Sequence, residues 1–353
     1  MKTSLSLRGA VARLLGFGLL FAGIFTPCVA ASAEDASGQG GKPSAAASGD
    51  AAAGAGSAEA LSEKALRLGE MYRDPLCGQI IVTCLVNGVP ARLMMDTGAT
   101  HTVLDRKFVD EVLKAEYVDT SKMQISGNAE EKPGIIVGDL QAGDTSFRGM
   151  MLVVMDLSGV NAMQSKPLAG ILGMDAMSRL SFIMDFRAER FTWGAFRDMS
   201  PFVPLEGRRD EAGRLFVTVQ SGEKSFPLLL DTGSSVTTLL PEQWAPGAEH
   251  MEDVKIADVN GPRTIRAGVG RQGALQLTPD VRTWNFSPQL LPAEADPGLL
   301  GMDALKMNVL VHKPDAQGRS RFYIGPVGVD WPVRRPGAQQ PARPAQSPLP
   351  TER

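Results

Sequence analysis

The sequence predicts a mainly β protein made of two copies of one unit. Two observations carry this prediction, an internal repeat and the strand-like spacing of apolar residues. Residues 78–104 and 213–239 align without gaps, and the motifs GILGMDA and GLLGMDA recur at 170–176 and 298–304. Two motifs that recur in the same order indicate a duplication of about 130 residues.

Apolar runs of strand length fill both copies, and helical spacing is scarce. Ile80–Val86 and Leu215–Gln220 are each followed by a turn signal, which is typical of a hairpin. Asp175 and Asp303 come where short helices can begin, so we expect them to act as N-caps. Further strands are expected at Ala91–Met95, Phe226–Leu230, Met150–Met155 and Leu180–Phe186, and the best helix candidate is Arg106–Ala115.

The regions that flank the repeat differ from it in composition. The stretch before it consists almost entirely of Ala, Gly, Ser and polar residues, and the end of the chain is rich in proline. Apolar residues recur at helical spacing between Leu61 and Met71. We therefore expect a signal peptide at 1–33, a disordered linker at 34–60, a helical lead-in at 61–77, two lobes at 78–200 and 201–331, and a disordered Pro-rich tail at 332–353.

The first residues are typical of an export signal. Lysine and arginine precede an apolar run at 14–24, and Ala31-Ser32-Ala33 offers a cleavage site. Cleavage after Ala30 is an alternative, and so is an uncleaved anchor, which would be the only membrane contact of the chain. Pro27 before Cys28 disfavours a lipoprotein. We expect an exported protein, either periplasmic or secreted.

Composition excludes several classes of function. The 353 residues carry 36 basic and 39 acidic side chains, interspersed, so no basic patch indicates a nucleic-acid partner. Only three histidines are present, His101, His250 and His312, which argues against a histidine-rich metal site. Gly268, Gly270 and Gly273 match a dinucleotide-binding pattern, but no helix or suitable acid follows. We expect no metal and no cofactor.

Two cysteines remain after the signal, Cys77 and Cys84. An export compartment permits a disulfide between them. In an extended chain, however, residues seven apart point to opposite faces. We favour Cys84 as a thiol of the core and leave a bridge open as the alternative.

The repeat also carries Asp-Thr-Gly after an apolar strand in both copies, as LMMDTGAT and as LLLDTGSS, followed later by ILG and LLG. On these motifs the chain from about Gly78 to Gly325 resembles the aspartic peptidases of the pepsin and retropepsin superfamily, in a bacterial exported form. The resemblance implies an acid-protease fold of two retropepsin-like closed β-barrel lobes, related by a pseudo-twofold axis. One aspartate of each lobe, Asp96 and Asp231, would meet at that axis.

Two carboxyl groups that share one proton can hold and activate a water. The resemblance therefore implies an aspartic endopeptidase that hydrolyses extended protein segments between Asp96 and Asp231. We expect it to act as a monomer on a polypeptide substrate. The alternative is a non-catalytic peptide-binding or scaffolding module of the cell envelope. A single lobe that dimerises is disfavoured, because the second aspartate is already on the chain.

The neighbours of the aspartates have roles by the same resemblance. Thr97 and Thr232 would cross the lobe interface and hydrogen-bond the opposite loop. Gly98 and Gly233 would keep the backbone close to the carboxylates.

The next position differs between the copies, with Ala99 in one and Ser234 in the other. A hydroxyl near a carboxylate stabilises its charge. We therefore expect Asp231 to be the more readily ionised partner and Asp96 to carry the shared proton.

Clefts in this superfamily are covered by a β-hairpin flap. Residues 125–129 and 258–261 lie at matching places, and Asn-Gly is a hairpin-turn signal. An ordinary surface loop is the alternative, and neither segment has the tyrosine of pepsin-like flaps. The candidate flap residues are Ser126, Gly127, Asn128, Asn260 and Gly261.

Overall fold

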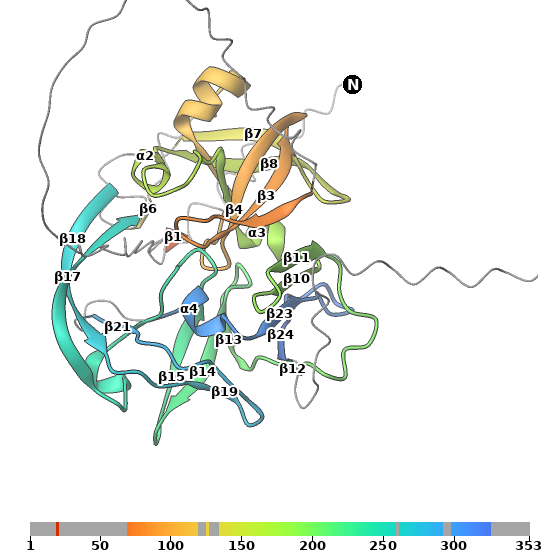
Figure 1. Ribbon diagram of the computed structural model, residues 1–353. Coiled ribbons are helices and arrows are strands. Elements are labelled where there is room, and N and C mark those ends of the chain that lie inside the picture. Colours follow the sequence, from red (N-terminus) through yellow and green to blue (C-terminus); the bar gives the residue numbers. More distant parts are fainter. Residues whose placement is uncertain are drawn as a thin grey trace, which may run out of the picture.

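The computed structural model describes residues 19–20, 69–118, 125–126, 134–258, 261–291 and 298–325. Within these residues the protein is mainly β, as the apolar pattern predicts (Figure 1). The expected linker and tail fall outside the described part, and of the expected signal peptide only β1 (Leu19–Leu20) is described, paired in parallel with β6 (Ile125–Ser126). No helix in the described ranges is long and apolar enough to cross a membrane.

The first copy folds into a sheet of seven strands in the order β2-β3-β4-β9-β5-β8-β7. An additional pairing of β3 with β7 closes six of these strands into a barrel. The turn between β3 and β4 is made by Asn87 and Gly88, both with positive φ, which is the conformation that a tight hairpin needs. The strands are β2 (Met71–Arg73), β3 (Ile80–Val86), β4 (Val89–Met95), β5 (Val103–Asp105), β7 (Gly134–Ala142), β8 (Thr145–Met155) and β9 (Gly170–Leu172).

The second copy repeats the same pairings. β15–β22 is parallel like β4–β9, β16–β22 is antiparallel like β5–β9, and β16–β21 is parallel like β5–β8. Among the described residues no further strand pairing closes this sheet. The strands are β13 (Gly207–Arg209), β14 (Leu215–Ser221), β15 (Lys224–Leu230), β16 (Thr238–Leu239), β17 (Ala248–Asp258), β18 (Gly261–Gly270), β19 (Gln276–Thr278), β20 (Val281–Arg282), β21 (Gln289–Leu290) and β22 (Leu299–Leu300).

A third sheet joins the two copies, in the order β11-β10-β23-β24-β12. At its centre β10 (Phe182–Asp185) pairs antiparallel with β23 (Val309–His312) (Figure 1), and both strands are buried along their whole length. The outer strands are β11 (Arg190–Trp193), β12 (Val203–Pro204) and β24 (Phe322–Gly325). Because side chains of both copies share one hydrophobic core, the two aspartate loops are held in a fixed relation.

Helices are few and short. The predicted helix at Arg106–Ala115 contains a π-helix, η1 (Phe108–Leu113). The others are α2 (Ser158–Asn161), α3 (Met174–Met177), η2 (Pro241–Gln243) and α4 (Met302–Leu305).

Two sequence predictions are wrong in this part of the fold. Met71 does not continue a helical lead-in but belongs to β2, which pairs with β3 as β13 pairs with β14. Residues 61–68 lie outside the described part. Asp175 and Asp303 are not N-caps, because Gly173 and Gly301 occupy the N-cap positions of α3 and α4. Because β2 and β13 are equivalent strands, the repeat begins earlier in the chain than its sequence identities indicate.

Cys77 and Cys84 are both buried and are not joined by a disulfide, so the bridge that the sequence leaves open does not form. Cys84 lies in the core on β3 with no exposed surface, as its place in an apolar run predicts. Cys77 lies in the turn between β2 and β3, where its thiol contacts the carboxylate of Asp74.

Candidate active site

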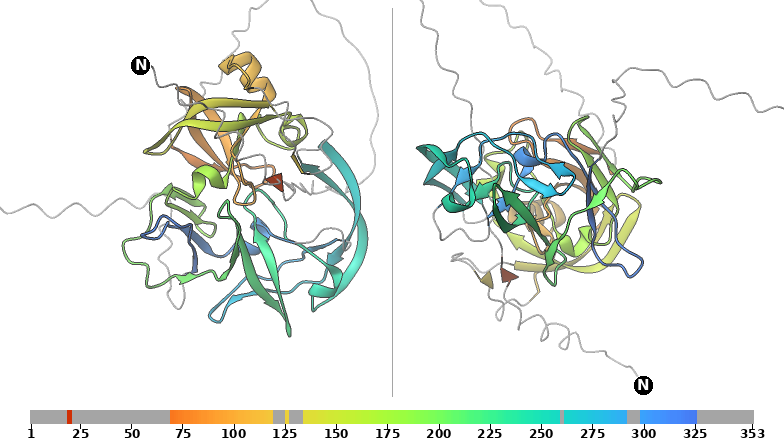
Figure 2. Two further views of the ribbon diagram at one scale, coloured as in Figure 1. Left: turned by 180° about the vertical axis from the view of Figure 1, so that it is seen from behind. Right: turned by 90° about the horizontal axis from the view of Figure 1, so that it is seen from below.

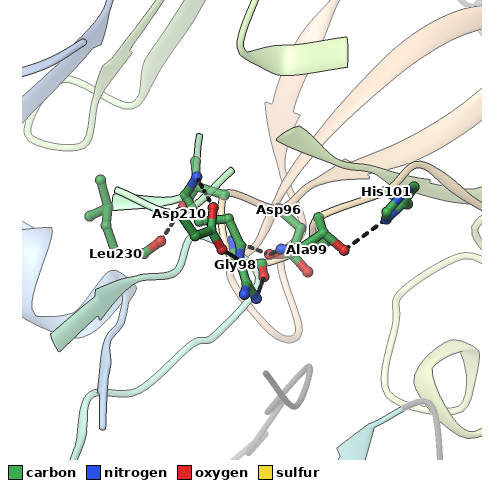
Figure 3. A network of polar contacts seen from close by, with 9 residues as sticks. Asp96, Gly98, Ala99, His101, Asp210 and Leu230 are labelled. Atoms are coloured by element: carbon green, nitrogen blue, oxygen red, sulfur yellow. Dashed lines mark hydrogen bonds and ion pairs between the residues drawn. The ribbon is translucent and has the colours of Figure 1, made fainter. Parts of the chain in front are cut away.

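The two Asp-Thr-Gly motifs follow the carboxyl ends of β4 and β15. They bring Asp96 and Asp231 together in the interior. Each aspartate is about 1% exposed. Asp96 Oδ1 accepts hydrogen bonds from the amides of Gly98 at 2.7 Å and Ala99 at 3.0 Å (Figure 3). Asp231 Oδ1 accepts one from the Gly233 amide at 2.9 Å. Each carboxyl group is therefore oriented by its own loop.

The glycines of the motifs leave room for the opposite carboxyl group. A Cβ on Gly98 would lie 2.7 Å from Cγ of Asp231, and a Cβ on Gly233 would lie 2.5 Å from Cγ of Asp96. Since any side chain at either position would push into the other aspartate, only glycine permits this approach. The two carboxyl groups are close enough to share a hydrogen bond.

The threonines of the motifs cross between the loops. Thr97 Oγ1 donates to the carbonyl of Leu230 at 2.7 Å, and Thr232 Oγ1 donates to the carbonyl of Met95 at 2.8 Å. Each hydroxyl also accepts the backbone amide of the other threonine at 3.1 Å. These four buried bonds fix the two loops against each other.

The following helices brace the loops from outside. Asp175 in α3 accepts the amide and hydroxyl of Thr102, and Asp303 in α4 accepts those of Thr237. A Cβ on Gly173 of the ILG motif would collide with the backbone of His101. A Cβ on Gly301 of the LLG motif would collide with the backbone of Val236. The ILG and LLG motifs, with the helices that follow them, therefore hold the Asp-Thr-Gly loops in place.

Two buried residues that support the site were not predicted from the sequence. Gln79 Nε2 donates to the carbonyl of Gly233 at 3.0 Å, and Arg214 Nη1 donates to the carbonyl of Gly98 at 3.1 Å. The signal was present, because each directly follows an aligned glycine of the repeat. Both side chains are buried and reach from one copy to the aspartate loop of the other.

The surroundings of the two acids differ, and they bear on which of the two is charged. Burial raises the pKa of Asp96, and its hydrogen bonds with Asp231, Gly98 and Ala99 and the Arg214 cation oppose that rise. Burial, the charge of Asp96 and the hydrogen bond to it all raise the pKa of Asp231, well above its ordinary range. These shifts and the two backbone donors to Asp96 favour the charge on Asp96 and the shared proton on Asp231.

Ser234 does not support the Asp231 carboxylate as the sequence predicts. Ser234 Oγ donates to the carbonyl of Val236 at 2.7 Å, so its hydroxyl does not serve the Asp231 carboxyl group. Asp96 Oδ2 is buried and receives no fixed donor from the described part of the chain. A proton on Asp231 fills that need.

The flap candidates are only partly described. β17 and β18 form a long hairpin whose pairing extends to Asp258 and Gly261, the residues that bound the predicted turn segment. Asn260 itself lies outside the described residues, as do Gly127 and Asn128 of the first copy. Ser126 is part of β6. The β17–β18 hairpin arches from the second copy to α2 of the first (Figures 1 and 2).

The histidines do not form a metal site. His101 is largely buried beside Thr100, with its ring Nδ1 2.8 Å from that hydroxyl, and burial lowers its pKa. Burial lowers the pKa of His312 to about 4 in the joining sheet, and His250 lies exposed on β17. Across the described ranges no three His, Cys, Asp or Glu side chains gather in a way that suits a metal ion.

Comparisons with known proteins bear on the first copy. Residues 82–176 match the family model described as aspartyl protease, and this match spans the first Asp-Thr-Gly motif and the ILG motif. A solved retropepsin-like aspartic protease from Rickettsia conorii is 21% identical, over 31% of this chain and 79% of that one, with a TM-score of 0.23. No curated protein matches. The family match shows that residues 82–176 are similar to aspartyl proteases.

Proposed function

We propose that this protein is an aspartic endopeptidase with one active site between Asp96 and Asp231. The observation that carries the proposal is the meeting of two buried carboxyl groups from equivalent loops, each against the glycine of the other loop. An ordinary turn does not need this arrangement, since burying two unpaired acids is costly. A shared proton makes it stable and chemically useful.

The chemistry follows from the division of charge. The Asp96 carboxylate accepts a proton from a water held between the two groups, while the oxygen of that water attacks the peptide carbonyl. Asp231 donates its proton to the carbonyl oxygen, giving a neutral tetrahedral intermediate. Asp96 then returns its proton to the leaving nitrogen, Asp231 recovers a proton as the carbonyl re-forms, and the C–N bond breaks. No group other than the two acids and water has to act.

The two copies act as two lobes about a pseudo-twofold axis. Support comes from the reciprocal threonine bonds and from β10 pairing antiparallel with its counterpart β23 at the junction. Because both acids are on one chain, a monomer is sufficient for activity. The N-terminal charged and apolar residues support export to the periplasm or the exterior.

The substrate class is an extended polypeptide segment. The β17–β18 hairpin reaches from the second lobe to α2 of the first, so it spans the two lobes. An extended peptide offers backbone groups that such a hairpin can pair with. The candidates for contact with that peptide are Asn260 and Gly261 in the second lobe and Ser126, Gly127 and Asn128 in the first.

The test is cleavage of a mixed peptide library by the purified protein from acidic to neutral pH. Asp96→Asn and Asp231→Asn should each abolish cleavage, whereas Asp280→Asn, at an exposed turn, should retain it. Cleavage that survives either active-site substitution would reject the mechanism. Peptides that bind without being cut by the wild-type protein would instead favour the binding module.

A further inference from the structure

The two residues that hold the aspartate loops from behind are equivalent in position but not in charge. Gln79 follows Gly78 and directly precedes β3. Arg214 follows Gly213 and directly precedes β14, the equivalent strand of the second copy. Each reaches the carbonyl of the second residue after the opposite aspartate. The surroundings of the two acids are thus matched in geometry, with a neutral amide on one side and a cation on the other.

Arg214 is connected to Asp96 through a single peptide group. Its Nη1 donates to the carbonyl of Gly98 at 3.1 Å, and the N–H of that same peptide group, on Ala99, donates to Asp96 Oδ1 at 3.0 Å. Hydrogen bonds in a chain polarise one another, so a cation on the carbonyl strengthens the amide as a donor. Arg214 is 5% exposed, which keeps its field from being screened by water.

On the other side the equivalent path carries no charge. Gln79 Nε2 donates to the carbonyl of Gly233 at 3.0 Å, and its Oε1 accepts Gln164 Nε2 at 3.1 Å. A neutral amide polarises the Gly233–Ser234 peptide group less than a guanidinium does. The asymmetry between the loops therefore comes from the residue behind each of them.

We propose that Arg214 is a positioning residue that decides which aspartate is charged: through the Gly98–Ala99 peptide group it stabilises the carboxylate of Asp96 and leaves the shared proton on Asp231. The effect of Arg214 on catalysis rests on the proposed function. Its effect on the charges of Asp96 and Asp231 does not.

Other charged groups near the dyad do not account for the asymmetry. Asp175 and Asp303 lie in matching helices, one behind each loop, and burial raises the pKa of both. Burial lowers the pKa of His101, the charge of Asp175 opposes this shift, and the charge of Arg214 adds to it. Asp210 forms an ion pair with Arg214 Nε at 2.6 Å and so weakens the cation without cancelling its effect on Asp96.

The experiment is an NMR titration of the aspartate carboxyl carbons in the full-length protein, with signals assigned from Asp96→Asn and Asp231→Asn. In the wild type, the signal of Asp96 should titrate at lower pH than that of Asp231. In Arg214→Gln, which copies the first lobe, the Asp96 midpoint should rise by about half to one pH unit. Arg214→Lys should restore most of the wild-type value.

Two further variants separate charge from packing. Asp210→Asn removes the counter-charge of Arg214, so the Asp96 midpoint should fall, which a loss of packing would not produce. Gln79→Ala removes the equivalent neutral contact and should leave the Asp96 midpoint in place. If Arg214→Gln fails to fold, the opposite shift in Asp210→Asn still decides the matter, and an unmoved midpoint there overturns the proposal.

The outcome is separable from that of the proposed function. An Asp96 midpoint that responds to Arg214 in a protein that cuts no peptide would leave the inference standing and reject the peptidase. In an active enzyme, the acidic limb of kcat/KM should move upward in Arg214→Gln together with the NMR midpoint. Active enzyme with the midpoint of Asp96 unmoved by Arg214→Gln, or moved equally by Arg214→Lys, would reject the role of Arg214.

Discussion

Replacing Thr97 by valine should destabilise the protein by removing one hydroxyl that makes two bonds between the loops. The substitution leaves the Leu230 carbonyl without its donor and the Thr232 amide without its acceptor, and both bonds are buried. A buried polar group that loses its partner costs about 1–3 kcal/mol, so the two together should cost about 2–6 kcal/mol in the free energy of unfolding. The two hydrogen bonds of Thr232 Oγ1 remain, so the two loops stay joined in the variant.

The assay is urea unfolding followed by tryptophan fluorescence at neutral pH, with Thr97→Ser as the matched control. Serine keeps the hydroxyl and loses one methyl group, which is worth roughly 1 kcal/mol. The valine variant should therefore unfold at clearly lower urea than the serine variant. A valine variant within 1 kcal/mol of the wild type, or one more stable than the serine variant, would refute the reasoning from crossed hydrogen bonds.

Three further outcomes are expected. Gly98→Ala places a Cβ 2.7 Å from Cγ of Asp231, so peptide cleavage should fall by about two orders of magnitude with the fold retained by circular dichroism; normal cleavage would show that the carboxyl groups need no such close approach. Burial raises the pKa of Asp303 from 3.8 to about 6, so ionising it should cost about 3 kcal/mol of stability as pH rises from about 4 to 6, a loss measured by unfolding at each pH and absent in Asp303→Asn. Burial raises the pKa of the Cys84 thiol to about 12, so a thiol reagent should label Cys84 only after denaturation, and rapid labelling of the native protein would contradict its place in the core.

Much of the site could be read from the repeat, because its residues make the same contact twice. Asp96 and Asp231, with their glycines, are identical in both copies, and the structure places them face to face. Residues that are identical in both copies therefore occupy equivalent surroundings. The β class likewise followed from apolar runs that end in turn signals such as Asn87-Gly88.

The features that escaped prediction depend on contacts between distant segments. The direction of the Ser234 hydroxyl is set by the Val236 carbonyl, and nothing in the sequence says which acceptor wins. Met71 has helical spacing with earlier apolar residues, yet pairing with Val82 on β3 overrides that local preference. Gln79 and Arg214 were overlooked because unlike residues at equivalent positions do not stand out in a search for identities.

The central claim is that one chain supplies both acids of a single active site. The most direct measurement mixes equal amounts of purified Asp96→Asn and Asp231→Asn proteins and assays peptide cleavage against the wild type. Both acids come from one chain and are held by bonds such as that from Thr97 to Leu230, so the mixture should stay as inactive as its components. Activity restored by mixing would show that sites form between chains and would contradict the account.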